Sequence, residues 1–161
     1  MFDGRMRRQV RWEVCDLSEQ GAMAEWLGTT VQYEGLPLAL RVRPTADTPE
    51  RRTCLRYLGA VTHQLARVRS NGLPEPEYNA GLADLDHSVI TALESEGGGL
   101  TVLIETLAGK RTYYGYVMSE EHARRAMSMV QSRFPDENLS LEVRADSDWG
   151  LYAEYRRLFP W

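Results

Sequence analysis

The side chains best suited to catalysis or metal binding are three histidines and two cysteines. His63, His87 and His122 each lack a histidine or cysteine at the four-residue spacing that places two ligands on one helix face. Cys15 and Cys54 form no Cys-x-x-Cys pair. The sequence therefore predicts no catalytic residue, no metal site and no cofactor. An enzyme whose active site lies near His63 and Cys54 is the alternative, because a thiol needs a nearby base to act as a nucleophile.

Carboxylates are concentrated in one stretch of the chain, and arginines in the stretch before it. No basic residue lies between Arg69 and Lys110, and the seven acids there are Glu75, Glu77, Asp84, Asp86, Glu94, Glu96 and Glu105. The preceding arginines are Arg41, Arg43, Arg51, Arg52 and Arg56. The simpler interpretation is a solvated acidic helix face with ion pairs inside the chain. The sharper hypothesis is that Asp84, Asp86 and Glu94 bind a basic segment of a partner protein.

Aromatic side chains suggest two further contacts with a partner. Tyr114 and Tyr116 share one face of a predicted strand, at the place where RNA-recognition domains stack bases. The residues before them lack the basic residue and the glycine of that signature, so packing within the sheet is the stronger interpretation. Trp149 and Tyr152 belong to a stripe that recurs every three residues. Such a stripe is typical of core packing and, as the alternative, of an exposed partner site.

Composition and charge limit the class of protein. The chain has 161 residues, of which 43% are apolar, and this suits a single domain with its own core. A net charge of −4 and an isoelectric point near 5.4 disfavour nucleic acid and anionic membranes as partners. The first residues lack an apolar run, and no window approaches the ~18 apolar residues of a membrane span. With two distant cysteines, these observations predict a cytoplasmic protein with reduced thiols.

Hydrophobic periodicity predicts strands that alternate with helices. The predicted strands are a short one at 10–15, a hairpin over 29–43, and further strands over 58–69, 100–105, 112–117 and 139–144. The predicted helices span 74–96 and 119–134, and a short last helix is capped by Ser147 or Asp148. Residues 58–69 also fit a helix, and we choose a strand because it completes the topology. Prolines at 44 and 49 indicate an irregular connection.

The order of these elements predicts the fold class. Residues 58–145 spell strand–helix–strand–strand–helix–strand, which is the split βαβ plan. We therefore expect an α+β, ferredoxin-like βαββαβ antiparallel sheet with two helices on one face, plus an N-terminal hairpin and a short C-terminal helix. The hairpin would extend the sheet or pack against its edge. The domain would span 28–161 after an N-terminal extension of 1–27, and its open sheet edges would permit a homodimer.

Four stretches of the chain resemble a known family. They are Tyr-Glu-Gly-Leu-Pro-Leu at 33–38, Asn-Gly-Leu-Pro at 71–74, Gly-Lys-Arg-Thr-Tyr-Tyr-Gly-Tyr-Val at 109–117 and Asp-Ser-Asp-Trp-Gly-Leu-Tyr at 146–152. Together they resemble the bacterial domain of unknown function 695, which is similar to the regulator of ribonuclease E activity, type B. The resemblance covers residues 28–160 and implies a ferredoxin-like fold. That regulator acts by binding its enzyme and not by catalysis.

The residues and the resemblance together predict a function. We expect a non-catalytic, cytoplasmic bacterial protein that binds a partner protein and modulates a partner enzyme. The alternatives are an enzyme with an active site near His63 and Cys54, and a weak RNA binder that uses Tyr114 and Tyr116.

Overall fold

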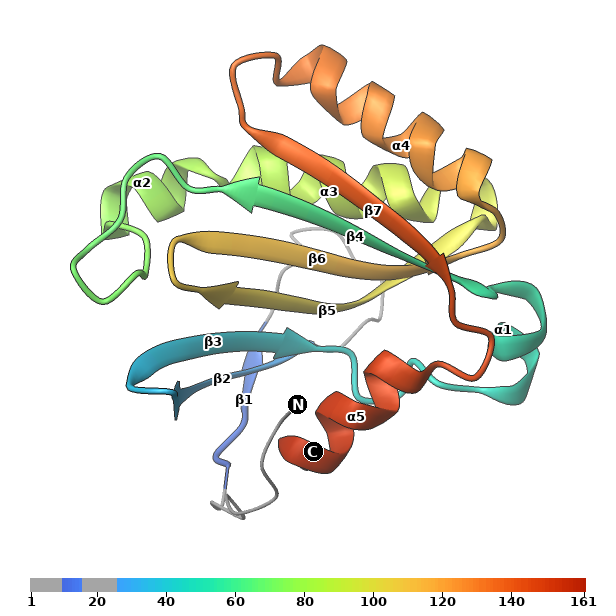
Figure 1. The fold of residues 1–161 in the computed structure, drawn as a ribbon, viewed down its shortest axis with the longest axis horizontal. Helices are drawn as coiled ribbons and strands as arrows, with labels where there is room; N and C mark the ends of the chain where they lie inside the picture. Colours follow the sequence, from blue (N-terminus) through green and yellow to red (C-terminus); the bar gives the residue numbers. More distant parts are fainter. Residues whose placement is uncertain (1–9, 16–25) are drawn as a thin grey trace.

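Alternating apolar residues build one seven-stranded antiparallel sheet in the computed structural model, which describes residues 10–15 and 26–161 (Figure 1). The strands lie in the order β1-β2-β3-β5-β6-β4-β7. Their bounds are β1 Glu13–Cys15, β2 Trp26–Tyr33, β3 Leu36–Val42, β4 Tyr57–Gln64, β5 Gly99–Leu107, β6 Lys110–Val117 and β7 Leu139–Ala145. Each neighbouring pair is antiparallel.

Helices lie on both faces of this sheet (Figure 1). One face carries α2 (Pro76–Gly81), α3 (Ala83–Glu94) and α4 (Glu120–Arg133). The other face carries α5 (Gly150–Leu158) and the chain segment that follows α1 (Pro49–Cys54). A single 3-10 turn, η1 (Ser95–Gly97), follows α3. No helix within the described residues has the length and apolar character needed to cross a membrane.

The predicted α+β class is confirmed, and the sheet is larger than the predicted four-stranded one. The strands β4 to β7 lie in the order β5-β6-β4-β7, and the hairpin β2–β3 pairs with β5 and so extends the sheet. The ambiguous segment 58–69 contains the strand β4, as predicted. In the predicted N-terminal extension, β1 pairs with β2, and Trp26 is buried in the core.

Two helices differ from the sequence prediction. Helix α1 lies where prolines indicated an irregular connection. It forms because Pro49 occupies its first turn, where no backbone N–H is needed, and the Thr48 hydroxyl accepts a hydrogen bond from the Arg51 N–H. The predicted helix 74–96 is divided into α2 and α3 at Leu82, whose backbone has φ −84° and ψ −1°. Gly81, a poor helix former, precedes this break.

Two apolar cores lie on the two faces of the sheet. The first is built under α3 and α4, and its members include Val61, Leu85, Val89, Ile104, Tyr113, Val117 and Val130. The second includes Leu38, Leu40, Val42, Leu103, Tyr116, Trp149 and Tyr152. Because side chains alternate along a strand, β6 contributes Tyr113 to the first core and Tyr116 to the second. Tyr114 packs against the second core, so Tyr114 and Tyr116 share a face, as predicted.

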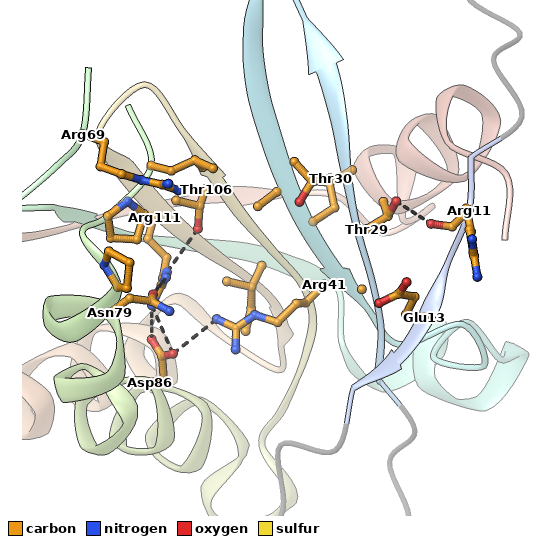
Figure 2. A pocket seen from close by; sticks show the side chains of 17 residues that line it. Arg11, Glu13, Thr29, Thr30, Arg41, Arg69, Asn79, Asp86, Thr106 and Arg111 are labelled. Atoms are coloured by element: carbon orange, nitrogen blue, oxygen red, sulfur yellow. Dashed lines mark hydrogen bonds and ion pairs between the residues drawn. The ribbon is translucent and has the colours of Figure 1, made fainter. Parts of the chain in front are cut away.

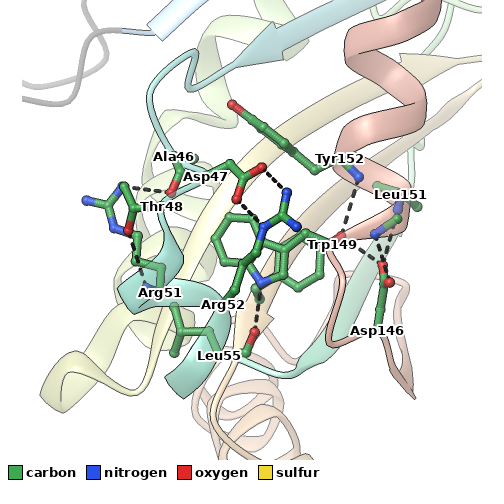
Figure 3. A network of polar contacts seen from close by, with 12 residues as sticks. Ala46, Asp47, Thr48, Arg51, Arg52, Leu55, Asp146, Trp149, Leu151 and Tyr152 are labelled. Carbon is green, nitrogen blue, oxygen red and sulfur yellow. Dashed lines mark hydrogen bonds and ion pairs between the residues drawn. The ribbon is translucent and has the colours of Figure 1, made fainter.

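Helix α5 is held to the sheet by an aromatic stack and by one carboxylate (Figure 3). The Trp149 ring is stacked on Tyr116 with centroids 4.1 Å apart, and its indole N–H donates to the Leu55 carbonyl at 2.8 Å. Asp146 accepts hydrogen bonds from the Gly150 N–H at 2.8 Å and from the Tyr116 hydroxyl at 2.8 Å. The predicted cap at Ser147 or Asp148 is therefore wrong. The chain turns through Trp149, whose φ is 56°, and this turn brings Asp146 to the first helical N–H groups.

We predict that Asp146→Ala lowers the free energy of unfolding by about 1–2 kcal/mol, because α5 loses its cap and the Tyr116 hydroxyl loses its acceptor. The matched control is Asp148→Ala, which changes an exposed residue whose side chain forms no hydrogen bond with any described residue. We expect the control to stay within about 0.5 kcal/mol of the parent. Urea unfolding followed by tryptophan fluorescence measures both variants. Equal losses would contradict the assignment of the cap to Asp146.

Candidate functional site

A hollow of 810 Å³ lies over the strands that the α3–α4 layer leaves uncovered (Figure 2). We call it the arginine hollow, because its lining residues include Arg11, Arg41, Arg69 and Arg111. The remaining polar side chains that line it are Glu13, Thr29, Thr30, Asn79, Asp86 and Thr106. The described lining residues thus carry four arginines against two carboxylates, an excess of two positive charges in a chain whose net charge is −4.

The strand register explains why a hollow forms here. Cross-strand partners place Gly28 beside Arg41, and Arg41 beside Ile104, in one row across the sheet. The next row places Thr30 beside Ala39. Gly28, Thr30 and Ala39 are therefore small floor residues over β2 and β3, whereas the first row continues under the helices with the large apolar side chains Ile104, Tyr113 and Val61. The sheet is wider than its helix layer, and the uncovered part is hollow because its residues are small.

Asp86 is the central side chain of the hollow's inner wall. Its carboxylate accepts from Arg111 Nη1 at 3.1 and 3.2 Å, from Arg41 Nη2 at 3.3 Å, and from the Tyr113 hydroxyl. Burial, followed by the charge of Asp86, raises the pKa of Tyr113, so this phenol remains a donor. Arg111 is only 5% exposed, and it also donates to Thr106 at 3.1 Å and to Asn79 at 2.5 Å.

Two other arginines of the hollow have guanidinium N–H groups that remain available to a ligand. Arg41 makes the one 3.3 Å contact with Asp86, and its Nε and Nη1 donate to no described side chain. Arg69 is exposed, and its side chain has no hydrogen bond or ion pair with the part of the chain that the structure describes. Both guanidinium groups point into the hollow or along its margin (Figure 2). A carboxylate or phosphate is the group that such planar donors bind best.

A protein-family model described as a family of unknown function (DUF695) matches residues 24–156. The chain belongs to this family. The match includes β2 through most of α5, and so nearly all strands and helices that build the arginine hollow. Neither a curated protein nor a solved structure matches the chain.

The three acidic residues that the sequence singles out have different environments in this DUF695 protein. Asp84 is exposed, and its carboxylate forms no hydrogen bond or ion pair with a described residue. Asp86 is neutralised by Arg41 and Arg111, as described above. Glu94 forms an ion pair with Arg43 at 2.8 Å and accepts from the Thr101 N–H at 3.0 Å. Two of the three acids therefore pair with arginines inside the chain, and they do not form an acidic surface for a basic partner.

The aromatic residues that the sequence singles out lie mostly in the core. Tyr116, Trp149 and Tyr152 are fully buried, so none of these side chains reaches a partner in this structure. Tyr114 is half-buried against α5, where its ring lies 6.0 Å from Tyr155. A base has no free face of Tyr116 on which to stack, because Trp149 occupies it.

The pair suggested for an alternative enzyme is not brought together. Cys54 is exposed at the end of α1, whereas His63 is fully buried near the other end of β4. The six steps of extended strand from Tyr57 to His63 span about 20 Å. His63 bonds through Nε2 to Glu137 at 2.7 Å. Among the described residues, no group of three or more histidine, cysteine, aspartate or glutamate side chains is placed to hold a metal ion.

Arg41 and Arg111 are the important residues that the sequence did not indicate. Both occupy polar positions of alternating strands, which in isolation are expected to face water. Their partner Asp86 is 45 residues from Arg41 and 25 from Arg111. The charge segregation along the chain was the available signal, and it indicated internal ion pairs without showing which residues would form them.

A second polar cluster lies on the opposite face of the sheet, between β5 and α5. Glu105 is half-buried there and accepts a hydrogen bond from the Tyr155 hydroxyl. Burial raises the pKa of Glu105 above its ordinary value of 4.5, although the bond from Tyr155 opposes this shift. Burial and the Glu105 charge raise the pKa of Tyr114 to about 12. Folding therefore favours the protonated form of Glu105.

We predict that Glu105→Gln stabilises the protein at neutral pH. The raised pKa of Glu105 means that its contribution is fully present below the unfolded value of 4.5 and is lost as the pH rises through the folded value. Glutamine keeps the acceptor for Tyr155 and does not ionise. Urea midpoints measured from acidic to neutral pH should show a gain that disappears below pH 4.5. Glu154→Gln, a change of an exposed residue on α5, is the control. A gain that is constant with pH would refute the prediction.

We predict that Asp86→Asn destabilises the fold by about 3–5 kcal/mol, because it leaves the buried Arg111 without its counter-charge. Asp84→Asn is a matched change of a neighbouring exposed carboxylate on α3, and we expect it to cost less than about 0.5 kcal/mol. Urea denaturation of both variants measures the difference. If the two variants lose the same stability, Asp86 does not have the structural role described here.

Proposed function

We propose that this DUF695 protein is a non-catalytic, cytoplasmic binding domain that recognises an acidic segment of a partner protein in the arginine hollow. The observation that carries the proposal is the free donor capacity of Arg41 and Arg69 at the margin of the hollow. Arg111 and Asp86 supply a rigid wall beside them, since both are held by several hydrogen bonds. A rigid, pre-organised wall reduces the ordering that binding requires.

The spread of the arginines favours a chain segment over a single small anion. Arg69 and Arg11 line opposite sides of the hollow, with β2 and β3 between them (Figure 2). One carboxylate or phosphate cannot contact both. Several acidic side chains of one peptide reach several guanidinium groups together, and such pairing is strong and specific.

Protein is favoured over nucleic acid as the partner. Guanidinium groups also bind phosphates, but proteins that bind single strands combine them with exposed aromatic platforms. The described lining of the hollow holds no aromatic side chain, and Glu13 and Asp86 interrupt its positive charge. The net charge of −4 further opposes a polynucleotide.

Binding is favoured over turnover by the chemistry of the lining. Its described residues include no histidine, cysteine or serine, and the carboxylate of Asp86 is occupied by three donor residues. The expected similarity of the family to the regulator of ribonuclease E activity agrees with this proposal, since that regulator acts by binding an enzyme. We therefore propose that this protein modulates a partner enzyme by capturing an acidic segment of it. We further propose that the strands β4 to β7, with α3 and α4, form a ferredoxin-like unit that carries β1–β3 as an extension.

We predict that a fluorescent peptide of alternating glutamate and aspartate binds this protein and that its affinity falls as salt is added. The double variant Arg41→Ala, Arg69→Ala should weaken binding at least about tenfold, because two charge-assisted contacts are lost. Arg41 is not needed to satisfy Asp86, which keeps its bonds with Arg111 and Tyr113. Arg156→Ala, Arg157→Ala removes two exposed arginines from α5 on the other face and is the matched control.

The same titration separates the competing ligands. Fluorescence anisotropy is measured with the acidic peptide, with a single-stranded RNA of the same charge, and with inorganic phosphate as competitor. The proposal expects the peptide to bind more tightly than the RNA, and phosphate to compete poorly. Tighter RNA binding, efficient displacement by phosphate, or equal effects of the two double variants would each overturn it.

A further inference from the structure

Strand β7 forms one end of the sheet, and β4 is its one described strand partner. The direction of its backbone groups follows from two bonds to the β4 side. The Asn138 carbonyl accepts from Gln64 N–H at 3.0 Å, and the Asp146 N–H donates to the Arg56 carbonyl at 3.0 Å. In an antiparallel ladder the N–H and C=O of one residue point to the same side and alternate along the strand. Even-numbered residues of β7 therefore face β4.

The odd-numbered residues of β7 present their backbone to the open edge. These residues are Leu139, Leu141, Val143 and Ala145, and no backbone group of the described residues outside the sheet bonds to their N–H or C=O groups. Leu141 and Val143 pack partly against the first core, so the backbone at the edge is held straight by the sheet and by α4. An ordered strand with free donors and acceptors is a template for pairing with another strand.

The exposed side chains of β7 alternate in charge on one face. Glu142 and Arg144 are two residues apart, both are exposed, and neither forms an ion pair with a described residue. Charged side chains on an edge strand, above all lysine, oppose pairing with an unrelated strand. A positive and a negative charge two residues apart are instead complementary to the same strand turned by a two-fold axis.

We propose that two copies of this chain pair along β7, antiparallel, about a two-fold axis that passes at Val143. In this register Glu142 of each copy lies opposite Arg144 of the other. Val143 lies opposite Val143, and Leu141 opposite Ala145. The backbone N–H and C=O groups of Leu141, Val143 and Ala145 point to the open edge, so these residues exchange backbone hydrogen bonds with the partner strand. The Glu142–Arg144 positions form the closer, non-hydrogen-bonded pairs. Opposite charges stabilise a sheet most at such positions.

Neighbouring registers are less favourable for a physical reason. Paired residues must lie on the same face, so the axis has to pass at a single residue of β7. An axis at Glu142 places glutamate opposite glutamate, and an axis at Arg144 places arginine opposite arginine. An axis at Leu141 places Glu142 opposite Ser140. It places Arg144 opposite Asn138, which precedes the strand, so neither charge has an opposite charge across from it. The register at Val143 alone forms both ion pairs, so the charges select both the partner and its alignment.

The charge variants test this pairing. Glu142→Arg places like charges opposite each other twice in the dimer, and so does Arg144→Glu. We expect each to raise the dissociation constant of the dimer by about tenfold or more. An equimolar mixture of the two single variants, and the double variant E142R/R144E alone, should both restore dimers. Glu154→Arg and Arg157→Glu repeat the same charge changes on α5 and are the matched controls. Analytical ultracentrifugation measures each species, and circular dichroism verifies the fold.

A cross-linking experiment tests the register. Val143→Cys, in a background in which Cys15 and Cys54 are serine, should form an intersubunit disulfide on mild oxidation, because hydrogen-bonded pairs have Cα atoms about 5.5 Å apart. Ser140→Cys lies opposite Asp146 in this register and should not. A parent that is monomeric at all concentrations would overturn the proposal. So would dimers that ignore the charge variants, or equal cross-linking of the two cysteine variants. The outcome is independent of peptide binding in the arginine hollow, so the two proposals can fail separately.

Discussion

The contacts of Asp86 hold the helix layer to the sheet at the point where that layer ends. This one carboxylate joins α3 to β3 through Arg41 and to β6 through Arg111 and Tyr113. A buried arginine needs a counter-charge, because the cost of removing it from water is large. With Asp86 in place, the sheet can carry polar side chains directly beside its apolar core. The strands beyond this boundary are free of helices, and the arginine hollow lies over them (Figure 2).

Ion pairs inside the fold make the candidate binding surface positively charged, whereas the sequence suggests a negatively charged one. Asp86 of the acidic stretch forms ion pairs with Arg41 and Arg111, and Glu94 forms one with Arg43. Once these acids are neutralised, the hollow retains an excess of positive charge, although the whole chain is acidic. We therefore propose an acidic partner in place of the basic partner expected from the sequence. A local potential of this kind directs association more than the net charge does.

The two proposed interactions lie at opposite ends of the sheet. The arginine hollow covers β1–β3, whereas the self-complementary edge is β7 (Figure 1). A dimer formed at β7 keeps both hollows free and carries them at its two far ends. A partner with two acidic segments, or a dimeric partner, would then bind with a gain from multivalency that neither hollow provides alone. The rigid sheet between the sites supplies a constant spacing.

The sequence by itself determined the α+β class, the hairpin over 29–43, the strand at 58–69 and the shared face of Tyr114 and Tyr116. These features depend on periodicity within short segments, where the alternation or the helical spacing of apolar residues indicates which side chains share a face. Tertiary structure alone decided that Asp146 caps α5, that Asp86 pairs with Arg41 and Arg111, and that α3 and α4 leave one face of β2 and β3 uncovered. Each of these depends on residues far apart in sequence. A charge or cap position is specified only when the packed elements bring its partner within hydrogen-bond distance.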